Sequence, residues 1–200
     1  YKSNDQIRVL EVSDFNTNGM VDYAMSSSGN NMRRFQNTPF GAYVKTTGDS
    51  IKEQNENQTS LGSHGIGKFA GYVMSEIQGI FCSSIFLDNK DNIVQATMGR
   101  VIQMSHYDHK DQQSYKSYAY WGEEKATQFK GIHESLPSPL QRVDADKKLV
   151  DENIGTTISI LYFRDEYNLH ELLIASAISN YFGSIMEGDL ELEIFGEIIN

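Results

Sequence analysis

The chain has 200 residues, of which 39% are hydrophobic, and its formal net charge is −10. This length suits one domain, with or without an extension, and the acidic balance argues against nonspecific nucleic-acid binding by this segment. No apolar run is long enough to span a membrane and no secretory signal pattern is present, so we expect a soluble protein with no membrane partner, and the single cysteine fits a reducing cytoplasm.

Strand patterns recur along the chain between polar turns. Runs of alternating or continuous apolar residues that are bounded by turn residues are typical of strands. We expect strands at 7–13, 79–87, 93–103, 115–121, 156–163 and 190–196. The turn at 88–92 makes a hairpin of the second and third strands, and a further turn is expected at 135–139.

Two segments have helical spacing, and a long polar segment at 14–63 is expected as loop with short helical pieces. The first helix, at 66–77, carries an inner face of Ile66, Phe69, Ala70, Val73, Met74 and Ile77. The second helix, at 168–186, stops before Gly188 and has the inner face Leu172, Leu173, Ala175, Ser176, Ile178, Ser179 and Phe182. Helices on one face of a mixed, mostly antiparallel sheet predict an α/β (α+β) fold, a two-layer sandwich.

The most informative stretch is the glycine-rich run at 62–70, which opens the first helix. Its residues are Gly62, Ser63, His64, Gly65, Ile66, Gly67, Lys68, Phe69 and Ala70. Glycines let the backbone approach a ligand closely, and a helix N-terminus offers unpaired N–H groups, so the run predicts an anion site, most often for phosphate. A surface turn that caps a helix is the alternative. Lys68 either meets a γ-phosphate or is solvated.

Three nucleotide motifs compete for this run. Gly62 to Lys68 matches a P-loop except that Phe69 stands where a Ser or Thr should reach magnesium. Gly65, Gly67 and Ala70 match a dinucleotide fingerprint. Both motifs need a preceding buried strand, whereas 51–60 is polar. A glycine loop entered from a long lid needs no such strand.

A second candidate site follows the first strand. Asp14 stands at its end, beside a turn that contains Asn16, Gly19 and Met20. Asn and Gly tolerate left-handed backbone, and the carboxylate is placed to accept a hydrogen bond from a base amino group; an Asx-turn is the plain alternative. We reject an EF-hand because Met25 stands where the bidentate Glu is needed.

Taken in order, these features resemble the GHKL ATPase superfamily, which includes gyrase B, the ninety-kilodalton heat-shock chaperones, MutL and the histidine kinases. The features are Asp14 with its turn, a lid, the glycine loop, and Gly155-Thr156 at the start of a late strand. The resemblance runs from about Arg8 to Phe195 and implies a Bergerat-type ATP-binding fold over 1–200. Details of the two loops are similar to prokaryotic MutL- and MORC-like ATPases, which are often linked to anti-phage defence.

The resemblance implies a role for each matching residue. Asp14 binds the adenine amino group, with Asn16, Gly19 and Met20 beside the base and Thr156 in support. The glycine loop and helix start, 62–69, surround the phosphates. The lid spans 21–61 and includes Gly48, Ser50 and Lys52. The implied ligands are ATP, ADP and Mg²⁺, and the implied behaviour is ATP-dependent homodimerisation and contact with other protein domains or subunits.

The chain departs from the family pattern in two ways. Asn16 replaces a glycine of the first box, and Gly19 lies one residue late. The family's helix with a general-base Glu and a magnesium-binding Asn does not precede Ile7; since Tyr1 is not an initiator Met, we expect upstream sequence. Glu53 and Asn57 have the spacing but lie in the lid, so no catalytic residue is assigned. A histidine-kinase ATP domain, an ATP-gated interaction module without turnover, and a Rossmann-type oxidoreductase are the alternatives.

Neither thiol nor imidazole chemistry is expected. Cys82 is the single cysteine, which excludes an internal disulfide, and it lies in an apolar strand as a core residue. His106 and His109 have no third ligand in view, so we expect a polar loop there and no protein-bound metal.

Overall fold

The computed structural model describes residues 7–21, 38–45, 67–121, 140–143, 147–165 and 168–200. The chain divides into two compact units, Tyr1–Phe163 and Arg164–Asn200, and each is described by itself. In the described part of the chain, no helix combines the length and the apolar character that a membrane crossing requires.

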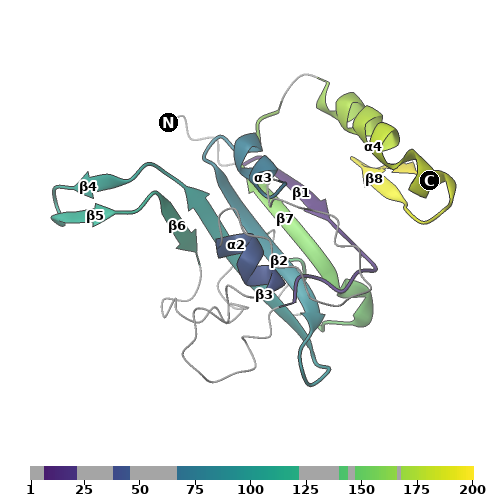
Figure 1. The fold of residues 1–200 in the computed structure, drawn as a ribbon, viewed down its shortest axis with the longest axis horizontal. Coiled ribbons are helices and arrows are strands. Elements are labelled where there is room, and N and C mark those ends of the chain that lie inside the picture. The colour runs from purple at the N-terminus through teal and green to yellow at the C-terminus, as the bar shows by residue number, and fades with distance from the viewer. Residues whose placement is uncertain (1–6, 22–37, 46–66, 122–139, 144–146, 166–167) are drawn as a thin grey trace. The chain divides into compact units, whose positions relative to one another are not determined.

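The first unit is built on a five-stranded sheet with the strand order β1-β7-β2-β3-β6 (Figure 1). The strands are β1 (Val9–Ser13), β7 (Gly155–Leu161), β2 (Gly79–Leu87), β3 (Ile93–Ile102) and β6 (Tyr118–Trp121). Each neighbouring pair is antiparallel, so the predicted mixed α/β class with a mostly antiparallel sheet is confirmed. The β2–β3 hairpin is confirmed too, and its turn is closed by the Asp88 carboxylate, which accepts the backbone N–H groups of Lys90 and Asn92.

Between β3 and β6 the chain makes a second hairpin, of β4 (His106–Asp108) and β5 (Gln113–Tyr115), which extends beyond the sheet (Figure 1). The predicted polar loop was therefore wrong at His106, which lies in β4, whereas His109 lies in the exposed turn between β4 and β5. The single strand predicted over 115–121 was wrong too, because β5 ends at Tyr115 and β6 begins at Tyr118. The histidine ring of His106 stacks on Tyr115, with ring centroids 5.3 Å apart. The two residues are separated in sequence, and the pairing of β4 with β5 brings their rings together.

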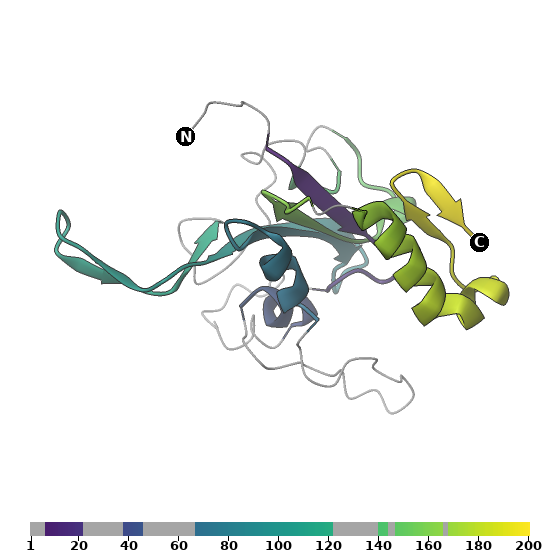
Figure 2. The ribbon, with the colours of Figure 1, turned by 90° about the horizontal axis from the view of Figure 1, so that it is seen from above.

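Two short helices, α2 (Pro39–Lys45) and α3 (Phe69–Met74), lie on the same face of the sheet, as Figure 2 shows. Thr38 starts α2, because its hydroxyl accepts the backbone N–H of Gly41 at 3.0 Å and Pro39 occupies the first helical position. The core beneath these helices joins apolar residues of α2, β2 and β3: Phe40, Val44, Cys82, Phe86, Ala96 and Met98. Within this unit, α2 and α3 cover one face of a mostly antiparallel sheet.

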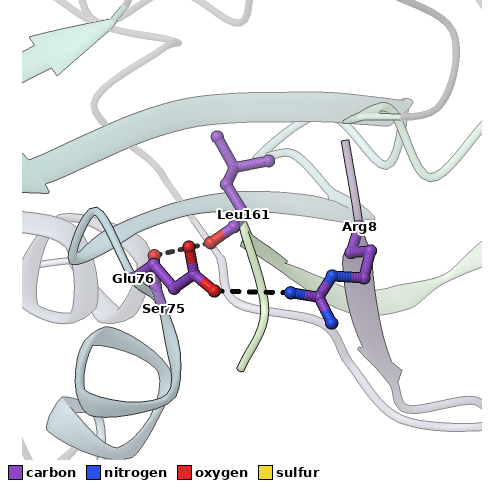
Figure 3. A network of polar contacts seen from close by, with 4 residues as sticks. All are labelled: Arg8, Ser75, Glu76 and Leu161. Carbon is purple, nitrogen blue, oxygen red and sulfur yellow. Dashed lines mark hydrogen bonds and ion pairs between the residues drawn. The ribbon is translucent and has the colours of Figure 1, made fainter. Parts of the chain in front are cut away.

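Helix α3 ends at Met74, earlier than the predicted 66–77. Ser75 takes extended backbone and bridges Phe163, and its hydroxyl donates to the Leu161 carbonyl at 2.6 Å while accepting the Gly79 N–H at 2.9 Å. Figure 3 shows this junction, where Arg8 also pairs with Glu76. The predicted inner face was wrong as well: Val73 is 70% exposed, and Tyr72 is buried instead.

Glycine rather than a bulky side chain lets α3 approach the sheet. A Cβ on Gly71 would lie 3.2 Å from Ile80 of β2 and 3.6 Å from Ile160 of β7. Helix α3 therefore covers the end of the β2–β7 pair where Ile80 faces Ile160.

The second unit holds α4 (Leu169–Met186), β8 (Leu192–Ile194) and β9 (Glu197–Ile199). The predicted helix over 168–186 and its stop at Gly188 are confirmed, since Gly188 has φ +76° and closes the last turn through its N–H to Ile185. The single strand at 190–196 was wrong: Gly196, at φ +86°, turns the chain into a hairpin. The inner face was wrong too, because Ala177 and Ile185 are buried while Leu172 and Phe182 are exposed.

Candidate functional site

The sequence-predicted residues Asp14 and Thr156 meet at one end of the β1–β7 pair. Their backbones exchange a hydrogen bond, from Asp14 N–H to the Thr156 carbonyl at 2.9 Å. The Thr156 N–H in turn donates to Oδ1 of Asp14, which also accepts the Thr17 hydroxyl at 3.1 Å. Among the described residues, Oδ2 of Asp14 has no hydrogen-bond partner, and the side chain is exposed. One carboxylate oxygen is thus fixed by the chain and the other is open to a ligand.

Beside this carboxylate lies a buried pair of hydroxyls, Ser84 of β2 and Thr156 of β7. Their oxygens are 3.2 Å apart, and Ser84 accepts the backbone N–H of Met20 at 2.7 Å. Both hydroxyls are at most 5% exposed. Ser84 was missed in the sequence because a serine inside an apolar strand carries no local signal of a site.

The turn between Asp14 and Met20 has the backbone that the sequence predicted. Asn16 has φ +57° and Gly19 has φ +65°, both left-handed. A Cβ on Gly19 would lie 2.3 Å from the Ile85 carbonyl oxygen, so this position requires glycine. The turn therefore lies directly against β2, and it brings Met20 to the hydroxyl pair.

The opposite face of the same strands also carries hydroxyl side chains, of which those of Thr157, Ser83 and Thr97 are buried and that of Ser13 is exposed. Because side chains alternate along a strand, Ser13, Thr157, Ser83 and Thr97 share the face away from Ser84 and Thr156. They lie in register across β1, β7, β2 and β3, with hydroxyl distances of 2.8 Å for Ser13–Thr157 and 2.9 Å for Ser83–Thr97. We call these four residues the hydroxyl row.

Arg142 joins the hydroxyl row to the Asp14 turn. Its guanidinium donates to the backbone carbonyl of Asp14, to the Thr157 hydroxyl at 3.1 Å and to the Asn153 carbonyl at 2.7 Å. Asn153 ends η3 (Asp151–Asn153), the short 3₁₀ turn before β7. Burial lowers the pKa of Arg142, and the Asp14 carboxylate opposes that shift. The sequence offered no sign of this residue, since its contacts are with residues distant in the chain.

The described part of the glycine run, Gly67 to Phe69, lies at the start of α3, over the same face as Ser84 and Thr156. No atom lies within 4 Å of a Cβ on Gly67. Lys68 is buried, and its ammonium donates to the Ala42 carbonyl of α2 at 3.4 Å. Arg100 donates to the Val44 carbonyl at 2.9 Å, so two cations lie against the carbonyl end of α2, where the helix dipole favours them.

The remaining predicted site residues lie outside the described residues: Gly62, Ser63, His64, Gly65, Ile66 and the lid residues Gly48, Ser50 and Lys52. Within the described ranges, no group of three or more His, Cys, Asp or Glu side chains is arranged to hold a metal ion. Magnesium that accompanies a nucleotide is bound largely by phosphate oxygens and water, so the described residues neither form nor preclude that arrangement.

Comparison with known proteins gives no match to a family model, to a curated protein or to a solved structure. The functional argument therefore depends on the geometry of the site.

Proposed function

We propose that this chain binds ATP in a GHKL-type, Bergerat-fold pocket on the helix-covered face of the sheet. The single observation that carries the proposal is the Asp14 carboxylate, with one oxygen held by Thr156 and Thr17 and the other open beside a buried hydroxyl pair. An exposed, pre-oriented acceptor of this kind suits the exocyclic amino group of a purine. A hydrogen bond to a charged acceptor contributes about 1.5–3 kcal/mol, enough to select adenine.

The residues around Asp14 fit the rest of a base site. The hydroxyls of Ser84 and Thr156 can donate or accept, directly or through water, and the backbone N–H of Met20 donates to Ser84 while its side chain packs against the core cluster. The left-handed turn at Asn16 and Gly19 brings backbone rather than side chains to the pocket edge. These are the features that discriminate a planar base with an amino group from one with a carbonyl oxygen.

The phosphates would lie toward the glycine run that precedes α3. Gly67 has open space at its Cβ position, which a phosphate could approach. Lys68 now donates to the Ala42 carbonyl, so contact with a γ-phosphate would exchange that hydrogen bond for a charge-assisted one. Magnesium would neutralise the phosphate charge when bound. We assign no general base, and the proposal concerns binding first and turnover second.

In this proposal the 21–61 segment closes over bound ATP, and closure acts as a conformational or dimerisation switch. Such a switch fits the resemblance to MutL- and MORC-like ATPases and a role in DNA-related or anti-phage processes. The partners would then be a second copy and other protein domains or subunits.

Calorimetric titration with a non-hydrolysable ATP analogue and Mg²⁺ tests the proposal. Asp14→Asn keeps the Oδ1 acceptor but replaces the open oxygen with an amide donor, so we expect affinity to fall at least about tenfold. Gly67→Ala should also weaken binding although the free protein has room for the methyl group. Gly183→Ala in α4, which has equally open space, is the matched control and should bind normally.

Failure of the wild-type chain to bind the analogue would overturn the proposal. If it binds, phosphate release distinguishes an ATPase from an ATP-gated module without turnover. Sedimentation with and without the analogue tests the homodimer.

A further inference from the structure

We propose that Arg142 is the positioning residue for Asp14 and acts from the far face of the sheet. This inference rests on the proposed function for its consequence in ligand binding. The geometry itself is independent of any ligand, because each contact below lies within the chain.

Arg142 ties together three segments that are distant in sequence. Its guanidinium reaches the Asp14 carbonyl at the end of β1, the Asn153 and Ile154 carbonyls before β7, and the Thr157 hydroxyl within β7. Its own backbone N–H donates to Ser83 of β2 at 3.1 Å. A planar guanidinium offers its donors in a fixed fork, so it sets the relative position of these acceptors in a way that a lysine ammonium cannot.

The cation hydrogen-bonds to the main chain of Asp14, whereas the carboxylate accepts its hydrogen bonds from Thr156 and Thr17. The carbonyl of Asp14 points to Arg142, whereas Oδ1 faces the Thr156 N–H. No ion pair between Arg142 and the Asp14 carboxylate occurs among the described residues. Arg142 therefore orients the carboxylate without occupying the oxygen that a ligand would use.

Gly155 gives independent support for this assignment. Its φ is +143°, and a Cβ there would lie 2.5 Å from the Asp14 carbonyl oxygen and 2.6 Å from Nη2 of Arg142. A side chain at this position would push the guanidinium away from its acceptor, so glycine is required where Arg142 and Asp14 meet.

An aromatic ring also contacts the half-buried guanidinium of Arg142. The Phe15 ring, which follows Asp14 directly, lies 4.5 Å from the guanidinium carbon and covers one side of it. The hydroxyl row extends the support to β3, because Ser83 contacts both Arg142 and Thr97. Arg142 is thus held both at its backbone N–H, by Ser83, and at its guanidinium, as a residue that positions another must be.

The first test needs no nucleotide. In Arg142→Met, we expect hydrogen exchange of the Thr156 amide, which donates to Asp14, to accelerate by about tenfold or more. Arg142→Lys should give nearly the same result, since the three donors of one compact ammonium cannot reach the four acceptors that the planar guanidinium spans. Arg8→Met, an arginine at the other end of β1, is the matched control and should leave Thr156 exchange unchanged.

The second test measures base discrimination, with ATP and ITP compared in each variant. ITP has a carbonyl oxygen where ATP has the amino group. Loss of positioning should lower ATP affinity by about tenfold and leave ITP affinity nearly constant, whereas a general loss of stability would lower both. In an Asp14→Asn background, Arg142→Met should then have no further effect on ATP binding. If Arg142→Met does not fold, Phe15→Leu removes only the covering ring and should give a smaller shift in the same direction.

The outcomes separate the two proposals. Faster Thr156 exchange in a protein that binds no nucleotide supports the role of Arg142 and rejects the ATP site. An unchanged ATP-to-ITP ratio and unchanged Thr156 exchange in Arg142→Met overturn the positioning role, whatever the wild type binds.

Discussion

A serine lies at each end of the β2–β7 pair, and the two serines have different surroundings: Ser75 follows α3, and Ser84 lies within β2. At one end, Ser75 donates to the Leu161 carbonyl and accepts the Gly79 N–H. At the other, Ser84 lies within reach of the Gly155 carbonyl, 3.4 Å away, and accepts the Met20 N–H. At the Ser75 end, the serine hydroxyl both donates and accepts a hydrogen bond within the chain. At the Ser84 end, only one oxygen of the Asp14 carboxylate has a hydrogen-bond partner among the described residues. A network that satisfies all its own members stabilises a fold, and one that leaves an oriented acceptor open is suited to a ligand.

The largest effect on stability should come from Gly155→Ala, because Gly155 lies next to Asp14 and Arg142. The new methyl group meets the Asp14 carbonyl and Arg142, and the backbone angle is one that L-residues rarely adopt. We expect a loss of about 3 kcal/mol in the free energy of unfolding, measured by urea denaturation. Gly67→Ala, with no atom near its Cβ, should change stability by less than about 0.5 kcal/mol without nucleotide. Equal losses in both variants would contradict the packing described for Gly155.

Paired serine variants compare the two ends directly. Ser75→Ala and Ser84→Ala each leave a backbone N–H without its side-chain acceptor, so each should cost about 2 kcal/mol of stability. Nucleotide affinity, measured below the unfolding transition, should fall in Ser84→Ala only. A loss of affinity in Ser75→Ala as well would mean that the two ends are coupled through the strands.

Between these ends, on the same face, the Cys82 thiol provides a pH-dependent probe. Burial raises its pKa well above the ordinary value, and the nearby Asp14 carboxylate adds to that shift. The unfolded thiol ionises near about pH 8.5 while the folded one stays neutral, so this contribution is complete at lower pH and declines as pH rises. The free energy of unfolding should therefore fall by up to about 1.4 kcal/mol per pH unit from about pH 9.

The matched variant for this titration is Cys82→Ala. It should be less stable at pH 7, because it loses buried volume, yet its stability should decline less steeply between about pH 8.5 and 10. Above about pH 10 the unfolded tyrosines ionise, and the raised pKa values of Tyr43 and Tyr72 add their own decline. Parallel pH profiles for the two proteins below pH 10 would exclude Cys82 as the source.

Local patterns predicted the parts of this fold that depend on local physics. The β2–β3 hairpin and α4 follow from apolar period and turn residues, and Asn16 and Gly19 take the left-handed backbone that their residue types allow. The C-terminal end of α3 was predicted three residues too late, because Ser75 makes hydrogen bonds to β7 and to Gly79 that outweigh the helical periodicity of the sequence. Arg142 escaped prediction entirely, since its partner Asp14 lies 128 positions away in sequence. Residues that act through distant backbone leave no local pattern to read.

The smallest effect should come from the ion pair between Arg8 and Glu76, which is drawn in Figure 3. Its nitrogen and oxygen are 3.3 Å apart, but the two side chains are 59% and 52% exposed. Water and salt screen such a pair, so Glu76→Gln should cost at most about 0.5 kcal/mol, and less at high ionic strength. The adjacent Ser75 carries no charge, yet its buried hydroxyl should contribute several times more. A larger loss in Glu76→Gln than in Ser75→Ala would reverse that order and would make charge, rather than buried hydrogen bonding, the force that closes this end of the sheet.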